Sequence, residues 1–267
     1  MSDWRGYDTV AEAYERVATP RFETVARHLL ATTRPPEDAR VLDLGTGTGA
    51  VAVALGEGLK ARGQVVGCDL ALPMLIRARR RAPGLRPVLA DAARLPFRNA
   101  SFDLVTANCV LSHLPDYRGA LQEVLRVLAK PSAFAASSWG PASDPYGDVW
   151  TELLDGAAGD GTVQRATQAV VPWEGHFSSP DSVRTALLDA GFDGVRVEMF
   201  DLTADLSIEE YVGDRALGGG GRLGCRTLGE SGWRAFLERA DRELRRRFGD
   251  RVRYSRPVVL GVGTVAQ

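Results

Sequence analysis

Val41-Leu42-Asp43-Leu44-Gly45-Thr46-Gly47-Thr48-Gly49 places an apolar strand directly before a glycine turn that opens a helix. Glycine permits the tight turn and lets a ligand approach the backbone, while the start of the helix offers N–H donors. The pattern Gly45-x-Gly47-x-x-Ala50 also fits the dinucleotide fingerprint, so the glycines alone do not identify the ligand. Asp43 separates the alternatives, because a carboxylate two residues before the first glycine repels a pyrophosphate but can hold an ammonium group, directly or through water. The segment therefore predicts a nucleoside with a cationic amino-acid tail; a glycine turn without any ligand is the alternative.

Strands and helices alternate around this turn. Such a βαβα order predicts a parallel sheet with right-handed crossovers and helices on both faces. The clearest helix is 117–129, where apolar residues recur at spacings of three and four, Asp116 can cap the start and Pro131 stops the end. The expected strands are 40–44, 64–68, 86–90, 102–107, 133–138, 195–200 and 256–265. The expected helices between them are 48–62, 71–82, 117–129, 149–154 and 181–190.

We expect all 267 residues to form one α/β domain with a Rossmann-like sheet. Two breaks in the alternation are interpreted as insertions that form a lid over the C-terminal edge of the sheet, where ligands bind in such folds. A linker between independent domains is the alternative. The expected parts are a helical segment at 1–36, a ligand-binding core at 37–139, insertions at 140–179 and 201–253, and residues 180–200 and 254–267, which complete the sheet.

Composition excludes several classes of protein. Hydrophobic residues make up 45% of the chain and charged residues 25%, which is typical of a globular protein and not of a disordered one. The net charge of −1 provides no overall field to attract nucleic acid or anionic lipid. Cys68, Cys109 and Cys225 are too few and too scattered for a disulfide framework or a zinc site, so no metal is expected. Because neither a signal peptide nor an apolar run of roughly 20 residues is visible, the expected location is cytoplasmic.

Asp69 ends the second strand, where a carboxylate can accept hydrogen bonds from both hydroxyls of a ribose. Dinucleotide enzymes share this feature, so Asp69 supports a nucleoside without choosing between ligands. The run from Val41 to Trp139 resembles a class I methyltransferase that uses S-adenosylmethionine, of the small-molecule branch related to ubiquinone and menaquinone methyltransferases. The resemblance implies a sheet of seven strands, the last of them antiparallel and formed by 256–265. The matching stretches are 41–49, 67–70, 74–75, 91–93, 95–97, 101–105, 111–116 and 123–128.

The resemblance also assigns roles at the cofactor. It implies that Asp91 receives the adenine amino group, that the Ala92 N–H faces ring N1, and that the backbone of Asn108 and Cys109 lies beneath the methionine part. The pocket this describes is apolar around the base, with a few polar groups that fix its orientation. The cofactor-binding residues expected are Tyr14, Asp43, Gly45, Thr46, Gly47, Gly49, Asp69, Leu70, Met74, Asp91, Ala92, Asn108, Cys109 and His113, of which Leu70 and Met74 enclose the adenine.

Two departures from the family pattern concern local stability. Lys130-Pro131-Ser132-Ala133 stands where the family has a proline followed by two glycines, and Ala71 replaces a helix-capping serine. The arginine-rich stretches 77–81 and 242–247 are interpreted as solvated helix faces, because no aromatic residues or RNA-binding module accompany them.

Catalysis by such a protein is an in-line displacement, in which the protein aligns the nucleophile and excludes water. A base is needed only when the nucleophile arrives protonated. His113 is the first candidate for this base, because the loop after the fourth strand lies beside the methyl group in this fold; a positioning role is the alternative. His176, between Trp173 and Phe177 in the first insertion, is the second candidate, and His28 is expected to be structural.

Aromatic residues gather in the N-terminal segment and the first insertion. Tyr7 and Tyr14 lie where related enzymes close a helix over the cofactor, with core packing as the alternative for Tyr14. Trp139, Trp150 and Trp173 suit either a flat, apolar acceptor or the packing of the lid.

The sequence thus predicts an S-adenosylmethionine-dependent methyltransferase whose acceptor is a small molecule of secondary metabolism, as in antibiotic biosynthesis. One alternative is a protein that binds the same cofactor without transferring methyl, as a regulatory subunit or a catalyst of cyclisation or rearrangement. A nicotinamide-dependent oxidoreductase is the other, against which Asp43 argues. No nucleic-acid or membrane partner is expected, and the chain is expected to be a monomer or homodimer. The acceptor, and whether oxygen, nitrogen or carbon is methylated, are left open.

Overall fold

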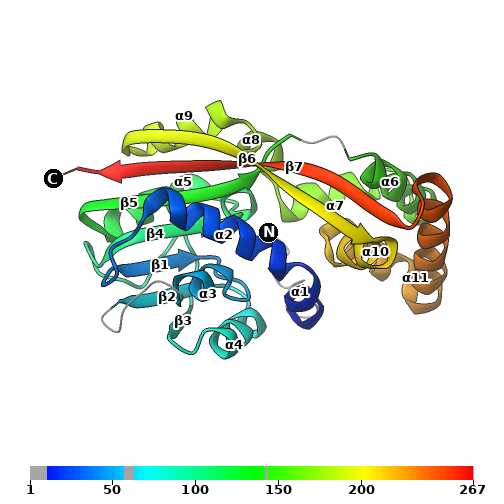
Figure 1. The fold of residues 1–267 in the computed structure, drawn as a ribbon, viewed down its shortest axis with the longest axis horizontal. Coiled ribbons are helices and arrows are strands. Elements are labelled where there is room, and N and C mark those ends of the chain that lie inside the picture. Colours follow the sequence, from blue (N-terminus) through cyan, green and yellow to red (C-terminus); the bar gives the residue numbers. More distant parts are fainter. Residues whose placement is uncertain (1–10, 57–62, 142–143, 267) are drawn as a thin grey trace.

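The computed structural model describes residues 11–56, 63–141 and 144–266, and within these ranges one seven-stranded sheet forms the centre of the molecule (Figure 1). The strands are β1 (Arg40–Leu44), β2 (Gln64–Asp69), β3 (Leu85–Leu89), β4 (Phe102–Asn108), β5 (Leu128–Trp139), β6 (Asp193–Ser207) and β7 (Arg251–Val265). Their spatial order is β3-β2-β1-β4-β5-β7-β6. β1 to β5 are parallel, and β7 is antiparallel to β5 and β6. The predicted α/β class and the antiparallel last strand are confirmed.

Helices cover both faces of the sheet, because alternate residues of its central strands point to opposite sides. Val41 of β1 belongs to a core formed with one set of helices, and its neighbour Leu42 to a core formed with another. The first face carries α2 (Thr19–Thr33), α3 (Ala50–Gly56) and α4 (Leu72–Arg81), with the short α1 (Ala11–Val17) before them. The second face carries α5 (Tyr117–Val127), α8 (Glu174–Phe177) and α9 (Pro180–Ala190).

The start of α5 is fixed by a side-chain cap. Asp116 Oδ1 accepts a hydrogen bond from the Gly119 N–H at 2.8 Å, as the sequence predicted. The stripe that includes Ala120, Leu121 and Val124 is buried, so the helix is held to the sheet by its apolar face. Ala71 gives α4 no side-chain cap, which confirms the predicted weak start of that helix.

The last two strands are longer than the sequence predicted. β6 and β7 pair continuously from Phe200 with Val258 to Ser207 with Arg251, and this half of the hairpin extends beyond the other strands (Figure 1). The expected strands, 195–200 and 256–265, stopped short because the extension has alternating exposed residues and no apolar run. Ion pairs between Asp205 and the arginines opposite it, together with backbone pairing, take the place of burial there.

The helices of the two insertions lie together beside this extension (Figure 1). They are α6 (Pro145–Ala158), α7 (Thr162–Val170), α10 (Ile208–Leu217) and α11 (Gly219–Phe248), and α11 bends at Gly229, whose φ is +67°. Trp150, Leu154, Tyr211, Phe236 and Leu244 are among the residues of their shared core, which is distinct from the two cores of the sheet. The insertions are thus joined into one layer at the C-terminal side of the parallel strands.

None of the described helices is both long and apolar enough to cross a bilayer. Among the same residues, no group of three or more His, Cys, Asp or Glu side chains is placed to hold a metal ion.

Replacing Asp116 with alanine removes the cap of α5, and we expect the free energy of unfolding to fall by about 1 kcal/mol. Urea denaturation followed by circular dichroism measures this change. Asp116→Asn keeps the accepting oxygen and is the matched control. Equal stability of wild type and Asp116→Ala would show that the cap does not hold the helix.

Candidate nucleoside and acceptor chamber

A chamber of about 1760 Å³ lies between the C-terminal ends of the parallel strands, the N-terminal helices and the insertions. Asp43, Asp69 and Asp91, which end or follow three neighbouring strands, all line it. A pocket for one small molecule typically has about 300–1,000 Å³, so the chamber has room for a nucleoside and a second molecule.

The glycine turn brings the backbone to the chamber. Gly45, Gly47 and Gly49 have φ values of +56°, +53° and +85°, in the left-handed region that favours glycine. A Cβ on Gly45 would lie 2.7 Å from a methyl carbon of Val110, so only glycine fits this close approach. The buried Thr46 between them donates its N–H to the Cys68 carbonyl at 2.9 Å, which fixes the turn to β2.

Asp43 is a buried carboxylate at the end of β1, with only 1% of its surface exposed. Thr106 Oγ1 of β4 donates a hydrogen bond to its Oδ1 at 2.7 Å. Burial raises the pKa of Asp43 to about 7, although the bond from Thr106 opposes the shift. A carboxylate in such a position is stabilised when a cation comes beside it, which is what an amino-acid ammonium group provides.

Asp69 and Asp91 are oriented by backbone N–H groups. Asp69 accepts from Gly47 N through Oδ2 and from Ala71 N through Oδ1, both at 2.9 Å, so it links the glycine turn to the start of α4. Asp91 accepts from Ala93 N at 2.9 Å. The predicted adenine neighbours Leu70, Met74 and Ala92 line the chamber as well. The structure therefore brings the predicted nucleoside-binding residues together, except Gly49, which is not among the described residues that line the chamber.

At the end of β4, Asn108 and Cys109 form hydrogen bonds that connect the lining of the chamber to α2 and β5. Asn108 Nδ2 donates to the Phe22 carbonyl of α2 at 3.0 Å, and its Oδ1 accepts from Ser137 Oγ at 2.8 Å. Cys109 has a φ of +57° and donates its N–H to the Ser137 carbonyl at 3.1 Å. Burial raises the pKa of the Cys109 thiol to about 11, so it is protonated at neutral pH and is no nucleophile.

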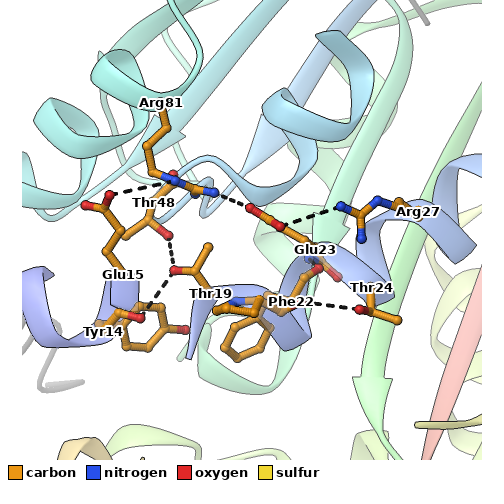
Figure 2. A network of polar contacts seen from close by, with 11 residues as sticks. Tyr14, Glu15, Thr19, Phe22, Glu23, Thr24, Arg27, Thr48 and Arg81 are labelled. Carbon is orange, nitrogen blue, oxygen red and sulfur yellow. Dashed lines mark hydrogen bonds and ion pairs between the residues drawn. The ribbon is translucent and has the colours of Figure 1, made fainter. Parts of the chain in front are cut away.

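The N-terminal helices close the chamber and hold the glycine turn (Figure 2). Tyr14 lines the chamber and stacks on Phe22 with 5.8 Å between ring centres. Thr19 Oγ1 of α2 lies 2.7 Å from Thr48 Oγ1, a hydrogen bond between the helix and the turn. Tyr7 lies outside the described residues.

Arg81 completes this connection, which no local pattern in the sequence predicts. Its Nη1 donates to the Thr48 carbonyl at 2.6 Å, and the guanidinium also pairs with Glu15 and Glu23 (Figure 2). Arg77 pairs with Glu12 and Glu15 in the same way. The interpretation of 77–81 as a solvated helix face is therefore wrong for Arg77 and Arg81, whose partners come from an element about 60 residues away in sequence.

His113 lines the chamber in a short 3₁₀ helix, Leu111–His113, just after β4. Its Nδ1 lies 3.1 Å from the Val170 carbonyl, so Nδ1 carries the proton and donates it. Burial lowers the pKa of His113 to about 4, and the imidazole is neutral at physiological pH.

The structure places His176 elsewhere. Its ring stacks on Tyr117 and meets Trp173 and Phe177 edge-on, within an aromatic cluster. It is not among the described residues that line the chamber, because this stacking directs the ring into the packing of α8 against the sheet. His28 stacks on Phe200 at 3.9 Å between ring centres, a structural contact.

Of the three tryptophans considered as acceptor contacts, two line the chamber and one is not among its described lining residues. Trp139, at the end of β5, lines the chamber. Trp150 also reaches the chamber but is 2% exposed and packs in the core of the insertions. Trp173 is partly buried against the sheet core and does not line the described part of the chamber.

The fold and this site define an α/β protein built to bind a nucleoside with a cationic tail. The methyltransferase domain family matches residues 42–136. The chain is 32% identical over 215 residues to a nocamycin O-methyltransferase of Saccharothrix syringae, with 76% of this chain and 75% of that protein covered. It belongs to the family of S-adenosylmethionine-dependent methyltransferases, and the predicted family and cofactor are confirmed.

Two further proteins are similar to this chain, the first in sequence and the second in fold alone. A malonyl-[acyl-carrier protein] O-methyltransferase of Halorhodospira halophila is 39% identical over 194 residues; the alignment covers 70% of this chain but spans only 60% of the relative's length. A Haemonchus contortus phosphoethanolamine N-methyltransferase, solved with phosphomonomethylethanolamine and S-adenosylhomocysteine, shares the fold with a TM-score of 0.58 and 15% identity. That comparison covers 97% of this chain and 58% of the other.

Binding of S-adenosylmethionine should strengthen as pH rises through the pKa of Asp43. The carboxylate form holds the ammonium group and the protonated form does not, so with a pKa of about 7 we expect the Kd at pH 6 to be about fivefold higher than at pH 7, where most of the ligand's ammonium group is still protonated. Isothermal titration calorimetry at both pH values measures the difference. Asp43→Asn should bind weakly at both values and show no such dependence; a pH-independent wild-type Kd would contradict the role of Asp43.

Loss of the Arg81 contacts should weaken cofactor binding without contact to the cofactor itself. We expect Arg81→Ala to raise the Kd for S-adenosylmethionine about fivefold, equivalent to about 1 kcal/mol, because the glycine turn loses its tie to the N-terminal helices. The same calorimetry measures this. Arg80→Ala, at an exposed position on the same helix, is the control, and equal effects of the two variants would argue against the tie.

Proposed function

We propose that this protein transfers the methyl group of S-adenosylmethionine to a small-molecule acceptor of secondary metabolism by in-line displacement. The observation that carries the proposal is the convergence of Asp43, Asp69 and Asp91 on one chamber that is large enough for a cofactor and an acceptor. The similarity to a nocamycin O-methyltransferase supports a small-molecule acceptor of this kind.

The residues present fit the cofactor. The buried Asp43 has no basic side chain as its partner in the described hydrogen bonds, and an ammonium group would supply the missing charge. Asp69 would hold the ribose and Asp91 the adenine amino group, since backbone N–H groups already fix both carboxylates toward the chamber. When bound, S-adenosylmethionine supplies a methyl group already activated on a sulfonium.

The protein's own contribution is then to position the acceptor and exclude water. Tyr14, Phe22 and Asn108 line the chamber and connect the N-terminal helices to the ends of β4 and β5. His113 also lines it, and the proton on its Nδ1 leaves the lone pair on Nε2. With a pKa of about 4, this imidazole is a weak base for an acceptor that arrives protonated.

The carboxylates of Asp69 and Asp91 provide the test. We expect Asp69→Ala and Asp91→Ala each to raise the Kd for S-adenosylmethionine at least about tenfold, because each removes a charge-assisted hydrogen-bond acceptor. Calorimetry measures binding, and Asp189→Ala, at an exposed position on α9, is the control. No binding by the intact protein would refute the proposal. Turnover of an acceptor without S-adenosylhomocysteine would instead show a cofactor-binding protein that transfers no methyl.

A further inference from the structure

Three arginines line the side of the chamber formed by the insertions. Arg21 comes from α2, Arg215 from α10 and Arg256 from β7. Arg21 and Arg256 meet at Trp139 at the end of β5, and Arg215 is close enough to both for their charges to act on it. Each keeps 32% of its side-chain surface exposed although all three lie within the chamber wall. Segments distant in sequence thus bring three guanidinium groups to one place.

The ring of Trp139 contacts the guanidinium groups of two of these arginines. The guanidinium carbon of Arg256 lies 4.6 Å from the centre of the Trp139 ring, and that of Arg21 lies 5.9 Å from it. Both distances are within the range of a cation–π contact. Burial lowers the pKa of Arg215 to about 10, and the nearby charges of Arg256 and Arg21 contribute to the shift, so the three positive charges act on one another. Arg215 stays protonated at neutral pH.

The carboxylates beside Arg21 and Arg256 pair with only some of the N–H donors of these two arginines. Arg21 pairs with Asp214 at 2.6 Å through Nη1, and Arg256 with Glu174 at 3.2 Å through Nη2. In the described part of the chain these are their hydrogen bonds, whereas a guanidinium has five N–H donors. The Nε atoms of Arg21 and Arg256 are buried and have no partner there. Both guanidinium groups therefore keep N–H donors that the described chain does not pair, and Oδ1 of Asp214 is likewise buried without a partner.

Arg215 forms an ion pair with Asp144, which also accepts hydrogen bonds from other donors. Asp144 also accepts from the Gly147 N–H at 2.8 Å, as the cap of α6, and from the Tyr211 hydroxyl. Asp214 exposes 12% of its side chain, less than the 32% of its partner Arg21. In these two pairs the guanidinium is more exposed than its carboxylate partner, whereas in the third pair Glu174 exposes 39% of its side chain against 32% for Arg256.

The weak basicity of His113 also favours an acceptor that arrives already deprotonated. His113 is neutral with its Nδ1 proton donated to the Val170 carbonyl, and His176 lies outside the described lining. A hydroxyl acceptor would need a base, whereas a carboxylic acid, with a pKa of about 4, arrives already deprotonated.

We propose that the acceptor is a small carboxylic acid, whose carboxylate is bound by Arg21, Arg215 and Arg256 beside Trp139 and is converted to its methyl ester. This proposal rests on the methyl transfer proposed above. One carboxylate oxygen is held by the guanidinium groups, and the other forms a bond to the methyl carbon as the sulfur–methyl bond breaks. The sulfur takes the electron pair of that bond, the positive and negative charges cancel, and no proton moves.

The experiment offers two matched pools of probes to the intact protein with S-adenosylmethionine tritiated on its methyl group. One pool contains aliphatic, polyene and aromatic carboxylic acids, and the other contains the primary amides of the same carbon skeletons. We expect label only in the acid pool, in products from which alkali releases it as methanol. A protein that binds S-adenosylmethionine but labels no acid, labels both pools equally, or forms an alkali-stable product overturns the carboxylate proposal. A protein that binds no S-adenosylmethionine overturns the proposed function instead.

Variants then test the arginines with the best acid of the pool. We expect Arg256→Gln and the double variant Arg21→Ala/Asp214→Ala to raise the KM for the acid at least about tenfold, with kcat within about threefold and the Kd for S-adenosylmethionine within about twofold. The double variant removes the pair together and leaves no buried carboxylate unpaired. Arg256→Lys should restore part of the loss, because the charge returns. Arg253→Ala, on the same strand with 72% of the side chain exposed, is the control. An unchanged KM in both arginine variants refutes the assignment.

Discussion

A buried carboxylate at the end of the central strand β1 is the constraint on which the site depends. Asp43 is held by Thr106 of the neighbouring strand, and burial disfavours its charged form, which raises its pKa to about 7. A fold stabilises such a group when a cation arrives beside it. The glycine turn that follows Asp43 would let a nucleoside with a cationic tail come close to the backbone. One segment therefore provides both the negative charge and the space for the ligand.

The residues that surround the glycine turn come from other parts of the chain, and the sequence of the turn does not specify them. α1 and α2 are joined to the turn through Thr19 and Arg81, and the arginine side chain ties the first helices to α4 as well. The position of the glycine turn is thereby coupled to the docking of the N-terminal helices. On the opposite side, the insertions have their own apolar core and present Arg215 to the chamber, while the sheet presents Arg256.

Two pairs of residues show where sequence patterns reach their limit. Arg80 and Arg81 are neighbours with the same side chain, yet one is exposed and the other binds the Thr48 carbonyl, because a helix turns by about 100° per residue and only one of them faces α1 and α2. His113 and His176 both lie in short helices, Leu111–His113 and Glu174–Phe177. Only the packing of Tyr117, Trp173 and Phe177 around His176 separates them.

The role expected of Asp91 followed from the family resemblance and not from its local pattern. The sequence alone determined the alternation of strands and helices and the class of ligand, because these follow from local periodicity and from the chemistry of Asp43, the glycine turn and Asp69 near two strand ends. It did not determine the extension of β6 and β7, where pairing across the hairpin replaces apolar burial. The meeting of Arg21 and Arg256 at Trp139, with Arg215 in the same chamber wall, was also decided only by the tertiary structure. Contacts between segments so far apart in the chain leave no local pattern, since their positions are fixed by how whole helices and strands pack.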